Sequence, residues 1–309
     1  MELRRLTADV YACEQEDRGL GWSNSGLVAR GGGLVVDTLY DLPLTRKMIA
    51  LYAEVHAAPV RRVVNTHHNS DHCWGNQLFG DATIIAHRGC VERFHDFLPA
   101  QAEAIRTMES PPEHLAQLQR ELAPFDFSGI ELRAPDHVLD GELMLDLDGM
   151  QVDIRHVGPA HTAGDLIVHL PVEGVVFAGD VVFHRCTPIG WEGSTDRWIE
   201  ALRTIESFEP QWVVPGHGPV CGVDGVRELR EYLEYVQREA RAHWAAGLTP
   251  LDACKRIDLG PYATWTDPAR LAANVHRVYR ECNGAKWDDP VDVSAVMADV
   301  RALHAIIHG

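Results

Sequence analysis

The sequence predicts a mixed α/β fold in which two β-sheets lie between layers of helices. The first two thirds of the 309-residue chain alternate short apolar segments with loops, which is the pattern of β-strands. Segments with apolar residues at helical spacing separate some of these strands, and the chain beyond residue 222 has a helical pattern throughout. This order of elements is compatible with an α/β or an α+β fold.

The N-terminal part is expected to begin with a strand meander and to continue with a helix and two further strands. Gly31-Gly32-Gly33 provides a tight turn inside the meander. The predicted strands cover residues 10–12, 26–29, 33–36, 62–65 and 82–86, and the predicted helix covers residues 42–57.

Residues 88–125 differ from their surroundings because Glu, Gln, Ala and Leu recur there at helical spacing, interrupted by prolines. We expect two or three helices, placed as a lid over the site. Strands then return, and Asp148-Gly149 is a hairpin turn between the first two of them. They are expected at residues 142–147, 151–156, 166–170, 174–178 and 212–214, with a helix at 198–208.

The C-terminal part is predicted to be helical. Asp224 can cap a helix that runs to about residue 244, and Gly247 is well placed to end it. Thr249-Pro250 resembles a capped helix start, and further helices are expected at 267–282 and 290–307. The chain is therefore expected to divide into a core of residues 1–222, which includes the insert, and C-terminal helices of residues 223–309 that pack on it.

The composition argues against several classes of protein. The chain has 28 basic and 45 acidic side chains, hence a formal net charge of −17, and no basic run, so a nucleic-acid partner is not expected. No apolar run approaches the roughly 20 residues that span a bilayer, and the N-terminus does not resemble a signal peptide. The seven cysteines form no C-x-x-C pair, so we expect reduced thiols and a cytoplasmic protein.

Candidate metal ligands are concentrated in one loop. The stretch NTHHNSDH at residues 65–72 follows a predicted strand and contains His67, His68, Asp71 and His72. Imidazole and carboxylate ligands suit zinc or iron, and a zinc site needs about four of them. Further ligands must therefore come from other segments.

Three later motifs each offer one such residue where a strand gives way to a loop. His161 lies in the glycine-flanked segment GPAHTAGD, Asp180 follows an apolar strand and Gly179, and His217 ends the segment VVPGH. Strand ends of this kind can converge on one edge of a sheet and present a rigid site.

These four motifs, in this order, resemble those of the metallo-β-lactamase superfamily. The family pattern is H-x-H-x-D-H, followed by G-H-T-x-G-D, G-D and G-H, and the resemblance extends over residues 9–218. It implies an αββα sandwich with one or two metal ions at its open edge. The implied ligands of the first metal are His67 and His161, those of the second are Asp71, His72 and His217, and the bridging carboxylate is Asp180.

The sequence departs from the family pattern at Asn69, which stands where a second histidine is expected. An amide oxygen is a weaker ligand than imidazole, so the first metal is expected to be held less firmly, or the enzyme to use one metal. His68 is not expected to replace it, because neighbouring side chains usually point in different directions. Asp165 matches a family carboxylate that orients the ligand loop without touching metal.

A metal at this site implies hydrolysis, because zinc lowers the pKa of bound water to around 7. Asp71 and Asp180 are the candidate catalytic residues, which would orient that water and hold its proton. We therefore expect a hydrolase with one or two Zn²⁺ ions that acts on an ester, thioester or lactone of a small acyl substrate.

A narrower resemblance indicates a second chemistry. Residues 21–26, 65–76 and 187–191 are similar to a subgroup that includes the cyclase–thioesterases of bacterial aromatic polyketide pathways. There, a metal-stabilised enolate would lead to ring closure. The candidate lining of a substrate pocket consists of Trp22, Trp74, Trp191 and His184.

Two alternatives stay open on the sequence alone. Ligand types do not separate zinc from iron, so an iron-dependent oxidoreductase of the same superfamily is one of them. The other is a non-catalytic metal-binding protein in which the change to Asn69 has disabled the site.

Overall fold

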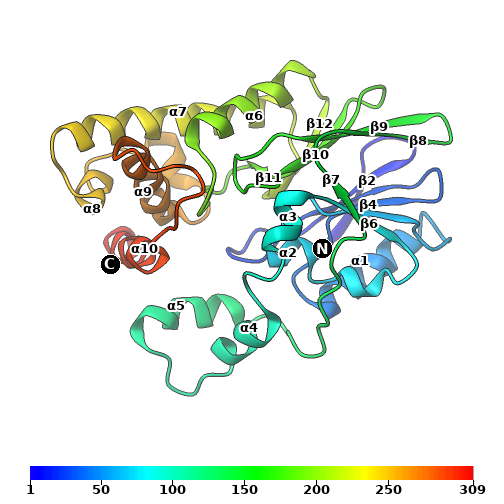
Figure 1. Cartoon of the computed structure of the whole chain (residues 1–309), viewed down its shortest axis with the longest axis horizontal. Coiled ribbons are helices and arrows are strands. Elements are labelled where there is room, and N and C mark those ends of the chain that lie inside the picture. Colours follow the sequence, from blue (N-terminus) through cyan, green and yellow to red (C-terminus); the bar gives the residue numbers. More distant parts are fainter. Residues whose placement is uncertain (309) are drawn as a thin grey trace.

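The computed structural model describes residues 1–308 and arranges them as two facing β-sheets with helices on the outer side of each (Figure 1). The predicted sandwich of two sheets between helices, and the helical region after it, are confirmed. Among the described residues, no helix combines the length and the apolar character needed to cross a membrane.

The first sheet has seven strands that lie side by side in sequence order. Neighbours from β1 to β4 pair antiparallel, and those from β4 to β7 pair parallel, so β4, β5 and β6 end at the same edge. The strands are β1 (Glu2–Arg5), β2 (Val10–Glu14), β3 (Ser25–Val28), β4 (Leu34–Val36), β5 (Arg62–Val64), β6 (Thr83–His87) and β7 (His137–Leu139). β1 and β7 were not predicted from the sequence.

The second sheet has five strands in the order β12-β11-β10-β9-β8. They pair antiparallel except for β11 and β12, which run parallel and are joined by a helix. The strands are β8 (Leu143–Leu147), β9 (Met150–His156), β10 (Leu166–Leu170), β11 (Val175–Phe183) and β12 (Trp212–His217).

The central strands are buried on both faces, which explains their nearly unbroken apolar sequences. Successive side chains of a strand point to opposite faces. In β4, Leu34 and Val36 join the core between the sheets, whereas Val35 packs outward with Met48. Met48 belongs to α1 (Leu42–Ala53), which begins where the Asp41 side chain accepts a hydrogen bond from the helix backbone.

Helices from the second half of the chain cover the outer face of the second sheet and extend beyond it (Figure 1). They are α6 (Thr195–Ser207), α7 (Val223–Ala245), α8 (Pro250–Cys254), α9 (Leu271–Cys282) and α10 (Val293–His308). Short 3₁₀ turns η2 (Gly260–Thr264) and η3 (Pro268–Arg270) lead into α9.

The segment after β6 forms three helices, as expected for the insert. They are α3 (Arg88–Arg93), α4 (Pro99–Arg106) and α5 (Glu113–Leu122), and α4 and α5 project from the core toward α10 (Figure 1). The loop after β5 contains α2 (Ser70–Cys73) and η1 (Asn76–Leu78). An aromatic cluster that includes Tyr40, Trp74, Phe94 and Phe125 attaches the insert to the first sheet.

Candidate metal centre

The six candidate ligands lie together at the edge where both sheets end. All are buried, and their ligand atoms form two groups in which every atom lies within 4.8 Å of the others. The first group, called here the His161 group, is His67, His161 and Asp180; the second, the His217 group, is Asp71, His72 and His217. The ligands come from the loop after β5, from α2, from the β9–β10 loop, from β11 and from the end of β12.

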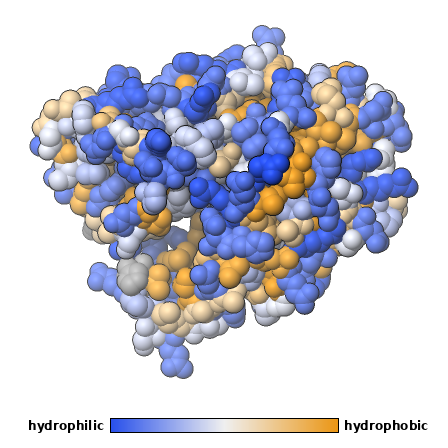
Figure 2. All heavy atoms as spheres, viewed as in Figure 1, coloured by the Kyte–Doolittle hydropathy of each residue, from blue (hydrophilic) through white to orange (hydrophobic). Residues whose placement is uncertain are grey.

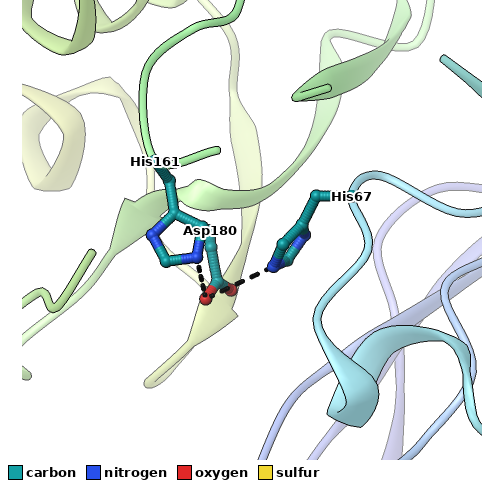
Figure 3. A group of neighbouring side chains, drawn as sticks. All are labelled: His67, His161 and Asp180. Atoms are coloured by element: carbon teal, nitrogen blue, oxygen red, sulfur yellow. Dashed lines mark ion pairs between the residues drawn. The ribbon is translucent and has the colours of Figure 1, made fainter. Parts of the chain in front are cut away.

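Asp180 lies between the two groups. Nε2 of His67 and Nε2 of His161 approach its carboxylate from opposite sheets (Figure 3), and lie 3.7 and 3.4 Å from Oδ2. On the other side, Nε2 of His217 lies 3.4 Å from Oδ2, and Nε2 of His72 lies 3.1 Å from Oδ1. This single carboxylate therefore contacts members of both groups, which is the arrangement expected of a bridging ligand.

The geometry of these atoms fits divalent metal ions. Ligands about 2.0–2.1 Å from a tetrahedral zinc lie roughly 3.3 Å apart, close to the separations around Asp180. Nε2 of His67 is buried and has no hydrogen-bond partner among the described residues, and Nε2 of His72 and Oδ1 of Asp180, which are buried 3.1 Å apart, are not aligned for a hydrogen bond with each other or with another described atom. Buried polar atoms are nearly always satisfied, so these three point to bound cations.

Asp37 orients His72 and was not identified from the sequence. Its Oδ2 lies 2.9 Å from Nδ1 of His72, and it also accepts hydrogen bonds from the backbone and hydroxyl of Thr66. A carboxylate behind a ligand histidine fixes the ring and makes it a better donor. The signal was present, because Asp37 directly follows the apolar strand β4, much as Asp180 follows the apolar start of β11.

The Nδ1 atoms of two other ligands also have partners. Nδ1 of His67 lies 3.0 Å from the hydroxyl of Thr66, and Nδ1 of His217 lies 3.2 Å from the carbonyl oxygen of Trp22. These contacts leave Nε2 of both rings free to face Asp180, so the backbone and one hydroxyl decide which nitrogen is offered to a metal.

Two glycines in the ligand motifs are required by close packing. A Cβ on Gly216 would overlap Oδ1 of Asp180, and a Cβ on Gly179 would overlap the hydroxyl of Thr66. Gly179 also has a φ of +49°, which disfavours other residues. The glycine before Asp180 and the glycine before His217 therefore allow β11, β12 and the loop after β5 to approach each other.

Burial and charge act on the histidines in opposite directions. Burial lowers the pKa of His161 to about 4, so its ring is neutral and able to bind metal at neutral pH. Burial also disfavours a charge on His217, but the carboxylates of Asp180 and Asp71 outweigh it and raise the pKa to about 10. A metal at the His217 group must therefore displace protons.

Asn69 faces the His161 group. Its amide nitrogen lies 3.5 Å from Nε2 of His161, and a half-turn of the amide would place the oxygen there. His68 is placed elsewhere: its Nε2 lies 3.5 Å from Glu192. Asp165 accepts hydrogen bonds from the backbone of Ala160 and from the backbone and hydroxyl of Thr162, and so holds the His161 loop.

A cavity of about 880 Å³ opens onto the metal centre and includes Asn69 and Asp71 in its wall. Its other walls come from the insert, from the segment between β11 and α6 and from the C-terminal region. The surface is hollowed between α5 and α10 (Figure 2). Apolar residues of these walls include Phe94, Phe97, Leu118, Ile189, Trp191, Val293, Met297 and Val300.

The structure separates the four residues proposed for the substrate pocket. Trp191 is part of the cavity wall. Trp74 is not: it is 1% exposed in the core of the insert, because the turn after α2 directs it inward to stack on Phe97. Trp22 supplies its carbonyl oxygen to His217. His184 lies with its Nδ1 2.8 Å from the carbonyl oxygen of Pro219, outside the described cavity lining.

Two curated relatives are hydrolases by name. A linear primary-alkylsulfatase of Pseudomonas sp. (strain ATCC 19151) is 24% identical over 312 residues, which is 89% of this chain and 58% of that protein. A metallo-beta-lactamase type 2 of Bacteroides fragilis is 27% identical over 116 residues, which is 36% of this chain and 47% of that protein. The chain thus spans about half the length of the curated relatives it matches.

Solved structures share the fold. The inverting sec-alkylsulfatase Pisa1 from Pseudomonas sp. superposes with a TM-score of 0.69 at 18% identity, over 94% of this chain and 51% of that chain. The DIM-1 metallo-beta-lactamase gives a TM-score of 0.54 at 19% identity, over 75% of this chain and 96% of that chain. The sequence model of the metallo-beta-lactamase superfamily matches residues 18–217, which include all four ligand motifs. The chain belongs to this superfamily.

Proposed function

We propose that this protein is a metal-dependent hydrolase that cleaves an ester bond in a small molecule with an apolar body, with zinc as its metal. The observation that carries the proposal is the position of the cavity. It places Asp71 and Asn69, one from the His217 group and one beside the His161 group, in the wall of a space large enough for a small substrate.

The residues divide into two sets of ligands. His67, His161 and Asp180 would hold one ion, with Asn69 in reach of it, and Asp71, His72 and His217 would hold the other. When bound, zinc would supply an activated water and would polarise the ester. Asp71 belongs both to a ligand group and to the cavity wall, so its carboxylate is placed to orient that water and to accept its proton.

The cavity favours a substrate with an apolar portion. Side chains from α5 and α10 face each other across it, and burying them against a ligand stabilises binding by roughly 25 cal/mol per Å² of apolar surface. Trp191 can stack on a flat substrate. The scissile ester would lie at the Asn69 and Asp71 end, with the apolar portion toward α10.

A sulfate ester is a second candidate for the scissile bond. The likeness to the two alkylsulfatases covers 89% and 94% of this chain and so includes most of the C-terminal helices, whereas the beta-lactamase likenesses cover 36% and 75%. The cyclase alternative rests on the narrower motif resemblance alone, and an acyl thioester rests on that resemblance and on the general chemistry of the metal, since none of the relatives described above is a thioesterase or a cyclase.

The test is a substrate panel on protein of known metal content. Elemental analysis first gives the metal and its stoichiometry, and iron in place of zinc would favour an oxidoreductase. A p-nitrophenyl acyl ester, an acyl thioester and an alkyl sulfate are then compared, before and after chelation and metal return. We expect hydrolysis of one class, abolished by chelation and by His161→Ala or Asp71→Ala, and retained by His184→Ala. Hydrolysis that survives both the chelator and Asp71→Ala would refute the metal mechanism.

A further inference from the structure

Arg277 is a buried arginine on α9 that reaches the loop carrying His161. It is 5% exposed, and its Nη1 donates a 3.0 Å hydrogen bond to the carbonyl oxygen of Ala160. Its Nη2 is buried and has no hydrogen-bond partner in the described part of the chain. A buried guanidinium with an unused donor is costly, so its presence at this position calls for a role.

His161 differs from the other candidate histidine ligands in the surroundings of Nδ1. The Nδ1 atoms of the other three rings have partners, whereas Nδ1 of His161 has none within residues 1–308. Gly190 lies against both groups: a Cβ there would be 3.2 Å from Nδ1 of His161 and would overlap Nη2 of Arg277. Arg277 therefore lies beside the ring on the side away from Asp180.

Trp198 of α6 lies between Arg277 and the two ligands that the second sheet gives to the His161 group, His161 and Asp180. The guanidinium carbon of Arg277 lies 4.8 Å from the ring centroid of Trp198. The ring centroids of Trp198 and His161 are 5.6 Å apart. The indole Nε1 donates a 2.8 Å hydrogen bond to the carbonyl oxygen of Val181, the residue after Asp180. Trp198 thus supports both the backbone next to Asp180, through its indole hydrogen bond, and the imidazole of His161, through an edge-to-face contact.

We propose that Arg277 is a positioning residue for the His161 group: it holds the loop through Ala160 and the imidazole through Trp198, so that Nε2 of His161 faces Asp180. The inference rests on the proposed metal centre. It gives the C-terminal helices a part in metal binding, although every ligand motif lies before residue 218.

The charge of Arg277 does not oppose this role, because acidic groups surround it. The carboxylates of Glu281, Asp165 and Glu192 act on it electrostatically, and burial lowers its pKa only to about 10, so it stays protonated at neutral pH. Lysine lacks the planar group that can both stack on an indole and donate at a fixed angle. The position therefore favours arginine over another cation.

The test measures metal binding by the full-length chain after metal removal. Apo-protein is titrated with Co²⁺, followed by its visible absorption, and with Zn²⁺ against a competing chelator. The variants are Arg277→Met, Arg277→Lys and Gly190→Ala, the last of which displaces the guanidinium without removing it. The control is Arg230→Met, which removes an arginine of α7 that pairs with Glu206 and Glu234 away from the site.

We expect the wild type to bind two equivalents. Arg277→Met should weaken one of them about 10-fold or more, as for other residues behind a ligand, and should change the Co²⁺ spectrum. Arg277→Lys should fall between the wild type and Arg277→Met, and Gly190→Ala should resemble Arg277→Met. Arg230→Met should lower the Tm and leave both binding constants and the spectrum unchanged.

The opposite outcomes are distinct. If Arg277→Met still binds two equivalents of metal, with unchanged or higher affinity, the inference is overturned and the proposed hydrolase stays intact. A wild type whose metal binding depends on His217 but not on His161 would overturn both the inference and the two-metal centre. If Arg277→Met does not fold, the spectra of Arg277→Lys and Gly190→Ala decide, and wild-type spectra in both would overturn the inference.

Discussion

Oδ2 of Asp37 lies 2.9 Å from Nδ1 of His72, at a point where both side chains are buried. The two residues follow neighbouring strands of the first sheet: Asp37 comes directly after β4, and His72 lies in α2, in the loop after β5. Because Asp37 also accepts two hydrogen bonds from Thr66, it holds the start of the ligand loop as well as the imidazole. The His217 group is therefore supported by a carboxylate that does not belong to either ligand group.

Asp37→Asn tests this support. The amide keeps the shape but removes the negative charge that strengthens His72 as a ligand, so we expect metal affinity at the His217 group to fall roughly 10- to 100-fold. Isothermal titration with Zn²⁺ measures the change. Asp41→Asn, at a carboxylate that caps α1 instead, should leave the affinity unaltered. Unchanged affinity in Asp37→Asn would mean that this carboxylate serves the fold alone.

Asn69→His restores the residue that the family pattern has at this position. An imidazole is a stronger zinc ligand than an amide, and Asn69 already faces His161 at 3.5 Å. We expect the weaker of the two zinc equivalents to bind at least about 10-fold more tightly, a gain of about 1.4 kcal/mol. Competition with a chromophoric chelator gives the two constants. Asn69→Ala should weaken the same equivalent, and no change in either variant would place Asn69 outside the site.

Gly216→Ala tests the packing between β12 and β11. The added methyl group would overlap Oδ1 of Asp180, so the carboxylate or the strand must move. We expect a loss of about 1–3 kcal/mol in the free energy of unfolding and a weakening of both metal equivalents, since Asp180 contacts both groups. Chemical denaturation and metal titration measure the two effects. Gly222→Ala would meet only an ordinary contact, 3.5 Å from the carbonyl oxygen of Gln211, and should leave both metal equivalents unchanged.

Metal removal is expected to destabilise the protein. The carboxylates of Asp71 and Asp180 both lie 3.4 Å from Nε2 of His217, and a bound cation offsets their mutual repulsion. Free zinc at 100 times its Kd adds about 2.7 kcal/mol of stability, so the Tm should fall by several degrees on chelation and recover on zinc return. In His217→Ala the difference in Tm between the zinc-bound and the chelated protein should be smaller than in the wild type. If the Tm of the wild type does not change when zinc is removed or returned, a metal centre at these residues is contradicted.

The half-buried His87 should make the protein sensitive to acid. Burial and, next, the neighbouring His156 lower the pKa of His87 to about 4, and its Nδ1 accepts a hydrogen bond from Gly89 that caps α3. The unfolded chain takes up this proton near pH 6.5, so between about pH 6.5 and 4 it binds more protons than the native state. Stability from His87 is therefore complete above pH 6.5 and is lost as the pH falls toward 4.

His87→Gln removes this titration. The Tm of the variant should depend less steeply on pH between about 6.5 and 4 than that of the wild type, as measured by thermal denaturation at constant ionic strength. His95→Gln changes an exposed histidine of the same segment and should keep the wild-type profile. Parallel pH profiles for the wild type and His87→Gln would rule out a contribution from this ring.

Most of the fold could be predicted because the core strands are apolar on both faces. β4, β10 and β11 read as strands on their own, whereas β1 and β7 were missed because they are edge strands with exposed polar residues. Such strands are stabilised by pairing with a neighbour, and a local pattern carries little information about that pairing.

The candidate ligands were identified by the sequence itself, because each stands at a fixed place in a short motif at the end of a strand. Their two groups, with Asp180 between them, were implied by the family pattern, and the structure supplies the distances. Asp37, Arg277 and the inward turn of Trp74 were decided by tertiary structure alone. So was the cavity, whose walls come from α5 and α10, which the chain separates by more than half its length. The physical reason is that the ligands can be recognised from residue type and spacing within a short motif. The residues that orient the ligands, the burial of side chains and the shape of the cavity depend instead on which distant side chains pack together.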